Sequence, residues 1–396
     1  MAEFEHPGVF VEEIPLPIHS IEGVPTGTAG FVGYTERAVE PETGRALTGE
    51  PTLIAGLRDY ERLFGGPGGA GYDLYAALRL FFENGGSRAA VVSVGPFGVV
   101  DAAQLGAGLD ALDEEKEHAI LLAPDALRLP KADYHAFARE MIERAAASKR
   151  RVAIVDLHGG GEPAVASEAG LAALLAEFRA AMAPLPADAR SFGAAYHPFL
   201  LTGEGPVPPS AAIAGLWSRN DIDRGVWKAP ANLAPSGAAG LSFEMSRAAQ
   251  EGMNAPPDGL AVNVIRSVPG RGILVWGART LDAGNGEYRY VSVRRTLIYI
   301  EQSVAAGLQS LVFEPNDAGT WTRARDVIDN FLQILWRAGS LQGAKPEAAF
   351  FVQCGLGTTM TQGDVDDGRL IVEIGMALVR PAEFVIIRIG QRMQAT

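Results

Sequence analysis

Three side chains capable of acid–base chemistry lie close together in the stretch "VDLHGGGE". Asp156, His158 and Glu162 occur where the apolar run "RRVAIVDL" ends, and that run predicts a buried strand. α/β enzymes carry catalytic groups at such strand ends, and a carboxylate near an imidazole can move a proton or bind a metal ion. One hypothesis is therefore an α/β hydrolytic enzyme that uses the loop of Asp156 and His158. The alternative is a solvated loop.

Two further stretches resemble ligand-binding motifs but lack their context. The glycines of "GPGGAG" (66–71) are spaced like a dinucleotide fingerprint, but a strand should precede such a turn and "LRDYERLF" predicts a helix. Asp364, Asp366 and Asp367 lack the spacing and closing glutamate of a calcium loop, which favours a polar turn. The sequence has no Walker-type phosphate loop, no Gly-x-Ser-x-Gly and no His-Glu-x-x-His. We expect no cofactor and no metal.

Composition and charge restrict the classes of partner. The 396 residues are 47% hydrophobic and 20% charged, which predicts a globular protein of two or three domains. The net charge of -13 argues against nucleic acid or an anionic membrane as partner, because both attract clustered Lys and Arg. Cys354, in "AAFFVQC", is expected to be a buried, unreactive thiol. With no signal peptide and no membrane-spanning run in the sequence, we expect cytoplasmic assembly without membrane insertion.

The middle of the chain alternates strand and helix patterns. The runs 88–94, 119–124 and 150–157 are short and almost continuously apolar, as in strands buried on both faces. The amphipathic stretch "YHAFAREMIERAA" separates the last two runs, which makes a βαβ unit. The predicted fold class is α/β (α+β mixed).

The second half contains a predicted hairpin and a predicted long helix. "GILVWGARTL" and "EYRYVSVRR" flank "DAGNG", whose Asn285-Gly286 pair favours a tight turn between two strands. The stretch 320–339 has one apolar stripe at helical spacing, with Thr320 as N-cap and Gly339 just past the end. Before this half, the Pro- and Gly-rich loop "GEGPVPPS" indicates a boundary or hinge.

Segments over most of the chain resemble the contractile tail sheath proteins of phages and of phage-tail-like injection particles. In the first part they are "HPGVFVEEIP", "IEGVPTGTAGFVGYT", "YERLFGG" and "LYAALRLFFENGGSRAAVVSV". In the second part they are "VPPSAAIAGLWSRNDIDRGVWKAPAN", "NVIRSVPGRGILVWGARTL", "YRYVSVRRTLIYIEQSV", "LVFEPND", "FLQILWRAGSLQG", "AFFVQC" and "GRLIVEIGMALVRPAEFVIIRI". The order is the same as in the family, and the least similar stretch is 95–200. The length is similar to the compact sheaths of extracellular injection particles, and a phage sheath also fits.

The resemblance implies a multi-domain sheath fold with a core built from the N- and C-terminal parts. The expected divisions are an N-terminal arm (1–25), the N-terminal α/β part of the core (26–95), an outward-facing variable α/β domain (96–205), a tube-facing C-terminal core domain (206–380) and a C-terminal strand arm (381–396).

In this family the terminal extensions leave their own subunit and add strands to a neighbour's sheet. This is β-augmentation, and because the contact is heterologous it builds open helical polymers. From the residues alone, the alternative is that both terminal runs pair within their own subunit. The expected arm residues are Val9, Phe10, Val11, Glu12, Glu13 and Ile14 at one end, and Phe384, Val385, Ile386, Ile387, Arg388 and Ile389 at the other.

The resemblance also singles out residues inside the chain. At the family-motif positions we expect tryptophans that pack in the core, each with a cation nearby that reaches a polar partner. These positions are Trp227, Lys228, Trp276 and Arg279. Three arginines of the helix 320–339 are expected to face the tube or to form a solvated polar face: Arg323, Arg325 and Arg337. Ion pairs within or between subunits are expected from Asp221, Arg224, Arg294 and Arg295.

The function that the resemblance implies is structural and not enzymatic. Sheath subunits polymerise helically around an inner tube, associate with baseplate and terminator or cap proteins, and contract to drive the tube through a target envelope. The energy is stored in the subunits at assembly, which agrees with the missing phosphate loop. The protein is then part of a phage tail or of an extracellular phage-tail-like particle. The alternatives are the enzyme with the Asp156 and His158 loop, and a closed-ring baseplate or capsid component.

Overall fold

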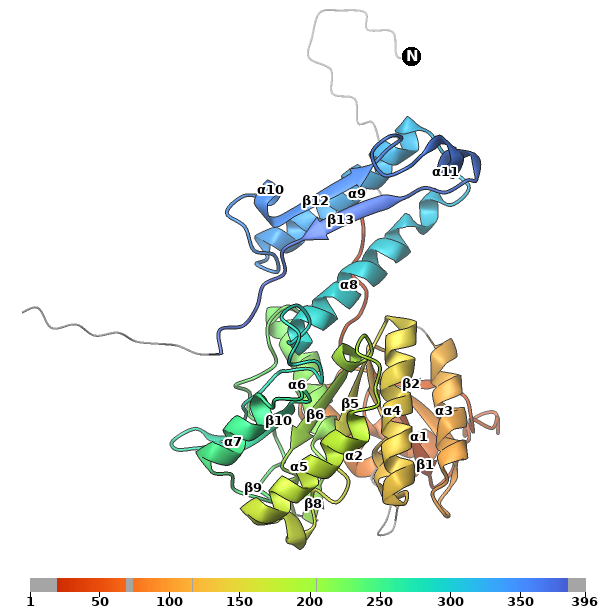
Figure 1. The fold of residues 1–396 in the computed structure, drawn as a ribbon. Helices are drawn as coiled ribbons and strands as arrows, with labels where there is room; N and C mark the ends of the chain where they lie inside the picture. The colour runs from red at the N-terminus through yellow and green to blue at the C-terminus, as the bar shows by residue number, and fades with distance from the viewer. Residues whose placement is uncertain (1–19, 69–73, 116, 204, 384–396) are drawn as a thin grey trace, which may run out of the picture.

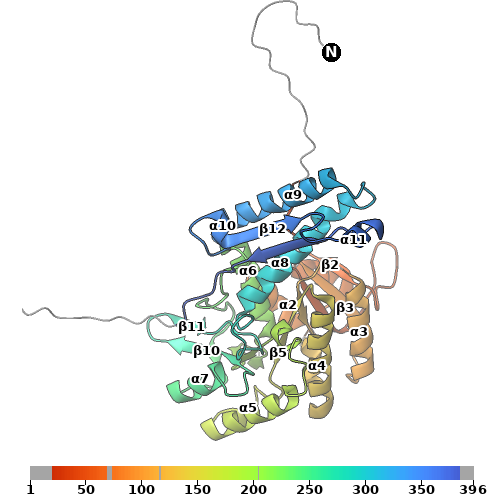
Figure 2. The same ribbon diagram turned by 45° about the horizontal axis from the view of Figure 1, so that its top comes forward.

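The computed structural model describes residues 20–68, 74–115, 117–203 and 205–383. They form a larger sheet body and a smaller C-terminal lobe, joined by the long helix α8 (Val291–Gly307) (Figure 1). We use the term sheet body for residues 28–290 and C-terminal lobe for residues 300–379. The view in Figure 2 shows that the lobe is a separate layer of helices and strands at the far end of α8.

An eight-stranded mixed sheet is the frame of the sheet body. The strand order is β11-β10-β6-β5-β4-β1-β3-β2, with parallel neighbours from β10 to β3 and an antiparallel strand at each edge. Strands β1, β4, β5 and β6 are buried along their whole length, as expected when both faces are covered. The strands are β1 (Ala29–Thr35), β2 (Thr52–Ile54), β3 (Ala89–Pro96), β4 (Ile120–Leu122), β5 (Val152–Asp156), β6 (Gly193–His197), β10 (Val262–Val268) and β11 (Gly272–Val275).

Helices cover the two faces of this sheet. Helix α3 packs with α4, and α2 packs with α6. Because right-handed crossovers from β1 to β3 and from β3 to β4 run in opposite directions along the sheet, α2 and α3 lie on opposite faces. The predicted βαβ unit is confirmed, since α4 connects the parallel neighbours β4 and β5. The helices are α1 (Leu57–Phe64), α2 (Leu74–Glu83), α3 (Ala102–Glu114), α4 (Lys131–Ser148), α5 (Glu168–Met182), α6 (Ser210–Arg224) and α7 (Arg247–Asn254).

Strands that precede and follow α6 in the chain form a small three-stranded antiparallel sheet. It contains β7 (Leu200–Thr202), β8 (Gly205–Val207) and β9 (Gly240–Leu241) in the order β8-β7-β9. The loop that was expected to mark a boundary or hinge therefore lies within this small sheet.

The C-terminal lobe has its own hydrophobic core. Helix α9 (Ala318–Arg337) packs its apolar stripe on the antiparallel pair β12 (Phe350–Cys354) and β13 (Val372–Met376). The predicted helix is confirmed, and Gly339 adopts φ +86 as expected, but the N-cap is Asp317, which accepts from the Thr320 N–H. Short helices α10 (Pro346–Ala349) and α11 (Gln362–Asp366) flank the strands. The core residues are Ile21, Ile300, Val304, Ile328, Phe331, Leu332, Leu335, Leu341, Ala349 and Phe350.

The predicted β-hairpin is wrong. Strand β11 ends at Val275, and the sequence "VSVRR" begins helix α8, so only a single antiparallel bridge between Arg279 and Tyr290 remains of the expected pairing. The first six residues of α8, 291–296, are all buried, and three of them are β-branched. A helix that is buried all round shows no amphipathic period, and its sequence resembles a strand.

The sheet does not follow the expected divisions 26–95, 96–205 and 206–380. Its strands come from all three segments, and one hydrophobic core extends from Ala29 to Ile298. Residues 96–205 are therefore part of the sheet body and not a separate unit. Strands of one expected division hydrogen-bond to strands of another in this sheet. The divisions therefore cannot be separate units without leaving strands unpaired.

Candidate assembly surface

The first described residues form a strap that runs along α8. We define the strap as residues 20–28. Ile21 packs in the lobe core against Gly307, where an added Cβ would lie 2.5 Å from the Ile21 Cγ1 atom. Farther along, the backbone N–H of Val24 donates to Ser303 Oγ at 3.1 Å. The start of the described chain is therefore fixed to the lobe.

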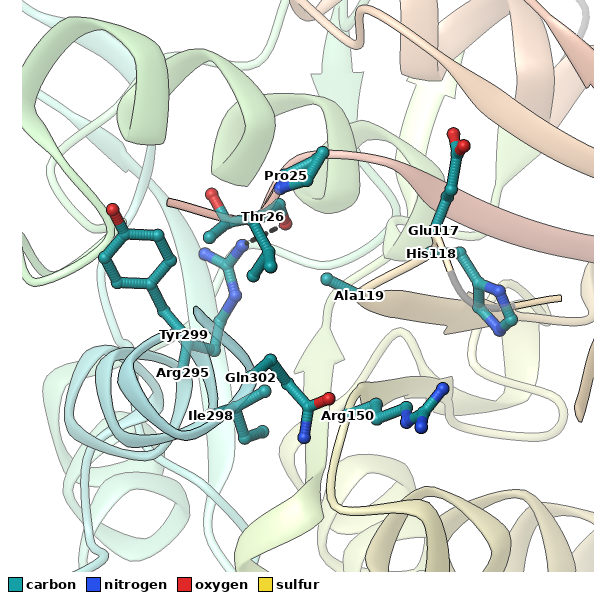
Figure 3. Close-up of a pocket in the computed structure, with 11 residues that line it drawn as sticks. Pro25, Thr26, Glu117, His118, Ala119, Arg150, Arg295, Ile298, Tyr299 and Gln302 are labelled. Atoms are coloured by element: carbon teal, nitrogen blue, oxygen red, sulfur yellow. Dashed lines mark hydrogen bonds between the residues drawn. The ribbon is translucent and has the colours of Figure 1, made fainter. Parts of the chain in front are cut away.

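A buried ion pair holds the other end of the strap. Arg295 on α8 donates to Oδ1 and Oδ2 of Asp221 on α6, at 2.9 and 2.5 Å. It also donates to the Thr26 carbonyl oxygen at 2.8 Å, the hydrogen bond drawn in Figure 3. The Thr26 hydroxyl also donates to Asp221, and the guanidinium lies 4.8 Å from the Trp217 ring centroid. The two charged side chains are only 3% and 4% exposed. The sequence left open whether this pair forms within or between subunits, and the structure places it within the chain.

A cavity of about 200 Å³ lies beside the strap (Figure 3). The strap, residues 117–119 just before β4, Arg150 and α8 line it. His118, the histidine on its wall, already has partners: Nδ1 lies 3.2 Å from the Glu115 carboxylate and Nε2 lies 2.7 Å from Arg151 Nη1. Burial lowers the pKa of His118, which favours a neutral ring whose Nε2 accepts from the arginine. This cavity is lined by groups engaged in internal contacts.

The last described residue, Glu383, is bound to the sheet body. Arg279 Nε donates to Glu383 Oε1 at 3.0 Å, Arg279 Nη2 donates to Oε2, and the Tyr290 hydroxyl donates to Oε2 at 3.2 Å. A further Arg279 donor reaches the Asn254 carbonyl at 2.8 Å. The hydrogen bond to Glu383 raises the pKa of Arg279, which keeps the guanidinium charged. The chain therefore returns from the lobe to the sheet body before residue 384.

The β12–β13 pair offers open strand edges. Ala377 N–H donates to the Ala349 carbonyl at 2.8 Å, and the register pairs Gly375 with Phe351. Because backbone groups in an antiparallel ladder alternate in direction, those of Val372, Ile374 and Met376 point away from β12. Among the described residues, none of these three has a backbone hydrogen-bond partner in that direction. This edge has the geometry that accepts an added strand.

The two faces of this strand pair differ. Phe350 and Cys354 are buried against α9, whereas Phe351 on the other face is 52% exposed. Phe351 lies over Gly375 on the neighbouring strand, where an added Cβ would be 2.0 Å from its ring. Cys354 is buried as expected, and burial raises the pKa of its thiol.

The loop that motivated the enzyme hypothesis has a structural function here. The Asp156 carboxylate accepts from the Ser210 N–H at 3.0 Å and from the Ser210 hydroxyl at 2.6 Å, at the start of α6. His158 Nε2–H donates to the Leu129 carbonyl at 3.1 Å, and its ring lies 5.4 Å from the Tyr134 ring. These contacts use the two groups to position α6 and the β5 loop.

At the place where a doubly wound sheet binds ligands, this chain has a buried side chain that bonds to its own backbone. The chain turns in opposite directions after β1 and β4, and ligands bind outside the carboxyl ends of such strands. Asp125 follows β4 there, is fully buried, and accepts from the backbone N–H groups of Tyr34 and Leu74 at 2.7 and 3.1 Å. Sequence reasoning missed Asp125 because "APDAL" carries no motif.

In the described residues, no group of three or more His, Cys, Asp or Glu side chains is arranged to hold a metal ion. In the same residues, none of the helices has the length and apolar character needed to cross a membrane. The Asp364 cluster forms a capping box with Thr361 and ion pairs with Arg369, which is the polar turn that the sequence favours.

Solved structures of contractile injection particles are similar to the whole chain. The anti-feeding prophage (AFP) helical sheath in the contracted state is 32% identical, with 98% of this chain and 100% of that chain covered and a TM-score of 0.76. A chain of the AFP baseplate is 34% identical, with 99% and 100% covered and a TM-score of 0.74. The contracted PVC sheath complex of an extracellular contractile injection system is 29% identical, with 99% of both chains covered and a TM-score of 0.73.

The match extends over the full length at more than 30% identity, and residues 284–392 also match the phage tail sheath C-terminal domain. The chain belongs to the contractile tail sheath family. It is a structural subunit of a contractile sheath, so self-association follows from family membership, and the hydrolytic enzyme is not favoured. A comparison with curated proteins gave no match.

The sheath-motif tryptophans are not both core residues. Trp276 is 38% exposed, so the expectation that it packs in the core is wrong: it directly follows β11, which is an edge strand of the eight-stranded sheet. Trp227 is half-buried and packs against the lobe core. Each nearby cation has a polar partner, since Lys228 Nζ donates to the Ala229 carbonyl at 3.3 Å and Arg279 binds Glu383.

The three arginines of this sheath subunit's α9 are exposed. Arg323 pairs with Glu314 at 2.8 Å, and Arg325 lies 3.5 Å from Asp326. Arg337 is in the last turn of α9, where its charge is favourable for the helix dipole. A tube-facing position for the three remains a prediction. The arm residues 9–14 and 384–389 lie outside the described residues.

Proposed function

We propose that the chain polymerises helically around an inner tube protein and that the sheath shortens to drive the tube through a target cell envelope. The observation that carries the proposal is the full-length similarity to an AFP helical sheath chain in the contracted state. The open β13 edge and the anchored ends of the described chain agree with it, because they provide an acceptor and two fixed points for linking segments.

The linking segments in this proposal are the two terminal arms. Residues 9–14 and 384–389 each add a strand to the β12–β13 pair of a neighbouring subunit, one arm at each edge. Main-chain hydrogen bonds then supply adhesion, and the alternating side chains fix the register. Each bond contributes roughly 0.5–1.5 kcal/mol net, so several per arm keep the mesh connected while the subunits move.

The proposed partners are further copies of the chain, the inner tube, the baseplate and a terminator or cap protein. The sheet body faces outward, and the C-terminal lobe with Arg323, Arg325 and Arg337 faces the tube. Assembly takes place in the cytoplasm, and the particle then acts outside the producing cell. The subunit acts without catalysis. The contraction energy is stored in its conformation, so contraction needs no cofactor.

Truncation tests the arms. Deleting Met1 to Ile14, or all residues from Phe384 onward, should leave a folded subunit that does not polymerise. Negative-stain electron microscopy, with the protein alone and coexpressed with its tube protein, measures this as loss of hollow striated tubes. Normal tubes from either truncation would contradict the arm assignment.

A single substitution tests the acceptor edge. Ile374→Pro removes an outward-pointing N–H from β13, and proline is tolerated on an edge strand. Ile374 also packs against the lobe core, so the variant should unfold at a lower midpoint than the wild type. It should still fold at the assembly temperature but form few or no tubes. Ile374→Val, which keeps the N–H, is the matched control and should assemble normally. Equal assembly of the two variants would exclude this edge as the acceptor.

A further inference from the structure

The two ends of the described chain are anchored on different parts of the subunit. At the N-terminal side, Ile21 packs in the lobe core and Val24 bonds to the distal half of α8. At the C-terminal side, the chain leaves β13, crosses back and binds through Glu383 to Arg279 in the sheet body. A segment that continues before residue 20 therefore departs from the lobe, and one that continues after residue 383 departs from the sheet body.

Arg279, which donates to Glu383, has a fixed backbone. The Asn263 side chain accepts from the Arg279 backbone N–H at 2.7 Å and donates to its carbonyl at 2.7 Å, so both backbone groups of Arg279 are fixed. Asn263 lies on β10, inside the eight-stranded sheet, and is fully buried. The guanidinium itself is restrained by its hydrogen bond to the Asn254 carbonyl at 2.8 Å.

The ion pair itself is largely desolvated. The side chain of Arg279 is 6% exposed and that of Glu383 is 18% exposed. Two guanidinium nitrogens face two carboxylate oxygens, and such bidentate, charge-assisted pairs are stronger and more directional than single hydrogen bonds. The Tyr290 hydroxyl adds a third donor from the residue that precedes α8.

We propose that Arg279, Tyr290 and Glu383 form a C-terminal root that positions the C-terminal arm on the sheet body, while the strap positions the N-terminal arm on the lobe. This inference rests on the proposed function of the arms. Each subunit then sends one link to its neighbours from its lobe and one from its sheet body. A rotation of the lobe relative to the sheet body changes the distance between the two departure points without breaking either.

Hydrogen exchange on the unassembled full-length subunit tests the root. Glu383→Gln keeps the shape but removes the charge, and exchange over residues 377–383 should become faster by on the order of tenfold, because charge-assisted bonds are lost. Tyr290→Phe removes a single hydroxyl and should give a smaller increase. The matched control is Glu373→Gln, an exposed glutamate on β13, which should leave exchange over 377–383 unchanged. Equal exchange in all three variants and the wild type would overturn the root.

Electron microscopy of assembled tubes tests whether the C-terminal root positions the C-terminal arm in the sheath. Tubes of the Glu383→Gln variant should be shorter than those of Glu373→Gln and should separate into fragments on contraction, because the link no longer has a fixed origin. If hydrogen exchange in Glu383→Gln is faster but its tubes are as long as those of Glu373→Gln and contract without breaking, the root does not position the arm. Normal tubes from the variant truncated at Phe384 would instead contradict the proposed function of the arm, whatever the exchange result.

Discussion

The guanidinium of Arg295 donates a hydrogen bond to the carbonyl oxygen of Thr26 across 2.8 Å, although the two residues lie 269 positions apart in the chain. This bond, with the Asp221 carboxylate on the same guanidinium, joins the strap, α6 and α8 at one buried point. The connection between the sheet body and the lobe therefore depends on a charge that solvent does not reach.

Removing that charge should destabilise the subunit strongly. Arg295→Met leaves Asp221 buried without its counter-ion, which costs about 3–5 kcal/mol of unfolding free energy. The double variant Asp221→Leu with Arg295→Met should lose less, because no uncompensated charge remains. Urea unfolding measures both. Arg325→Met on the exposed face of α9 is the control, expected to change stability by less than about 0.5 kcal/mol. Equal losses for Arg295→Met and the control would contradict the buried-pair argument.

Acid should weaken the fold through His197. This ring is fully buried, neither nitrogen has a hydrogen-bond partner among the described residues, and burial lowers its pKa to about 4. The stabilisation is complete above about pH 6.5, the ordinary histidine pKa, because the ring is then neutral in both states. As the pH falls towards 4, only the unfolded chain takes up the proton, and stability drops by about 1.4 kcal/mol per pH unit.

The measurement for His197 is a series of urea unfolding curves between pH 7 and pH 4. His197→Phe has no titrating group at this site and should show a shallower loss of stability with falling pH. His118 and His135 also have lowered pKa values because of burial, so a residual slope is expected in the variant. A slope identical to that of the wild type would contradict the assignment to His197.

Two glycines in helices should respond to alanine with opposite signs. An added Cβ at Gly215 in α6 would lie 2.3 Å from the Phe81 carbonyl oxygen in α2, so Gly215→Ala must separate the two helices and should destabilise by about 1–3 kcal/mol. At Gly106 in α3 nothing lies within 4 Å of the added atom, and Gly106→Ala should stabilise by about 0.5–1 kcal/mol through higher helix propensity. Thermal unfolding of both variants checks the pair, and stabilisation of both would exclude the α2–α6 contact.

Phe313 should be replaceable with a gain in subunit stability. It is fully exposed and has φ +73, a left-handed backbone that an aromatic residue adopts at a cost of roughly 1–2 kcal/mol. Asparagine adopts this region more readily, so Phe313→Asn should raise the unfolding midpoint of the free subunit. If the variant is stabilised but forms fewer tubes, the exposed ring contacts a neighbouring protein in the sheath. A lower midpoint would show that the left-handed backbone is not a source of strain.

Short-range patterns predicted the parts of the fold that short-range physics determines. The apolar runs now seen as β3, β4 and β5 are inner strands of a sheet covered on both faces, where almost every side chain is apolar. Helix α9 has one face on the lobe core and one in solvent, so its period is visible in the sequence. The first residues of α8, 291–296, are all buried, and for that reason "VSVRR" was predicted as part of a strand.

The candidate site depends on contacts that no local pattern encodes. Arg279 and Glu383 are 104 positions apart, and nothing in the family-like stretch that contains the glutamate indicates that it pairs with an arginine. The family-motif arginine was identified by resemblance, but its partner required the three-dimensional path of the chain back from β13. The unpaired edge of β13 is likewise visible only when its neighbours are known, since the same apolar alternation occurs in paired strands.

Helix α8 has one end in the sheet body and the other in the C-terminal lobe, so a small tilt at one end produces a large displacement at the other. Its 17 residues span about 25 Å at 1.5 Å per residue. A tilt of about 10° at the Tyr290 end would move the far end by about 4 Å, close to the spacing of about 4.8 Å between paired strands. A turn of the lobe too small to disturb either core would thus shift an attached strand by almost one position in a sheet.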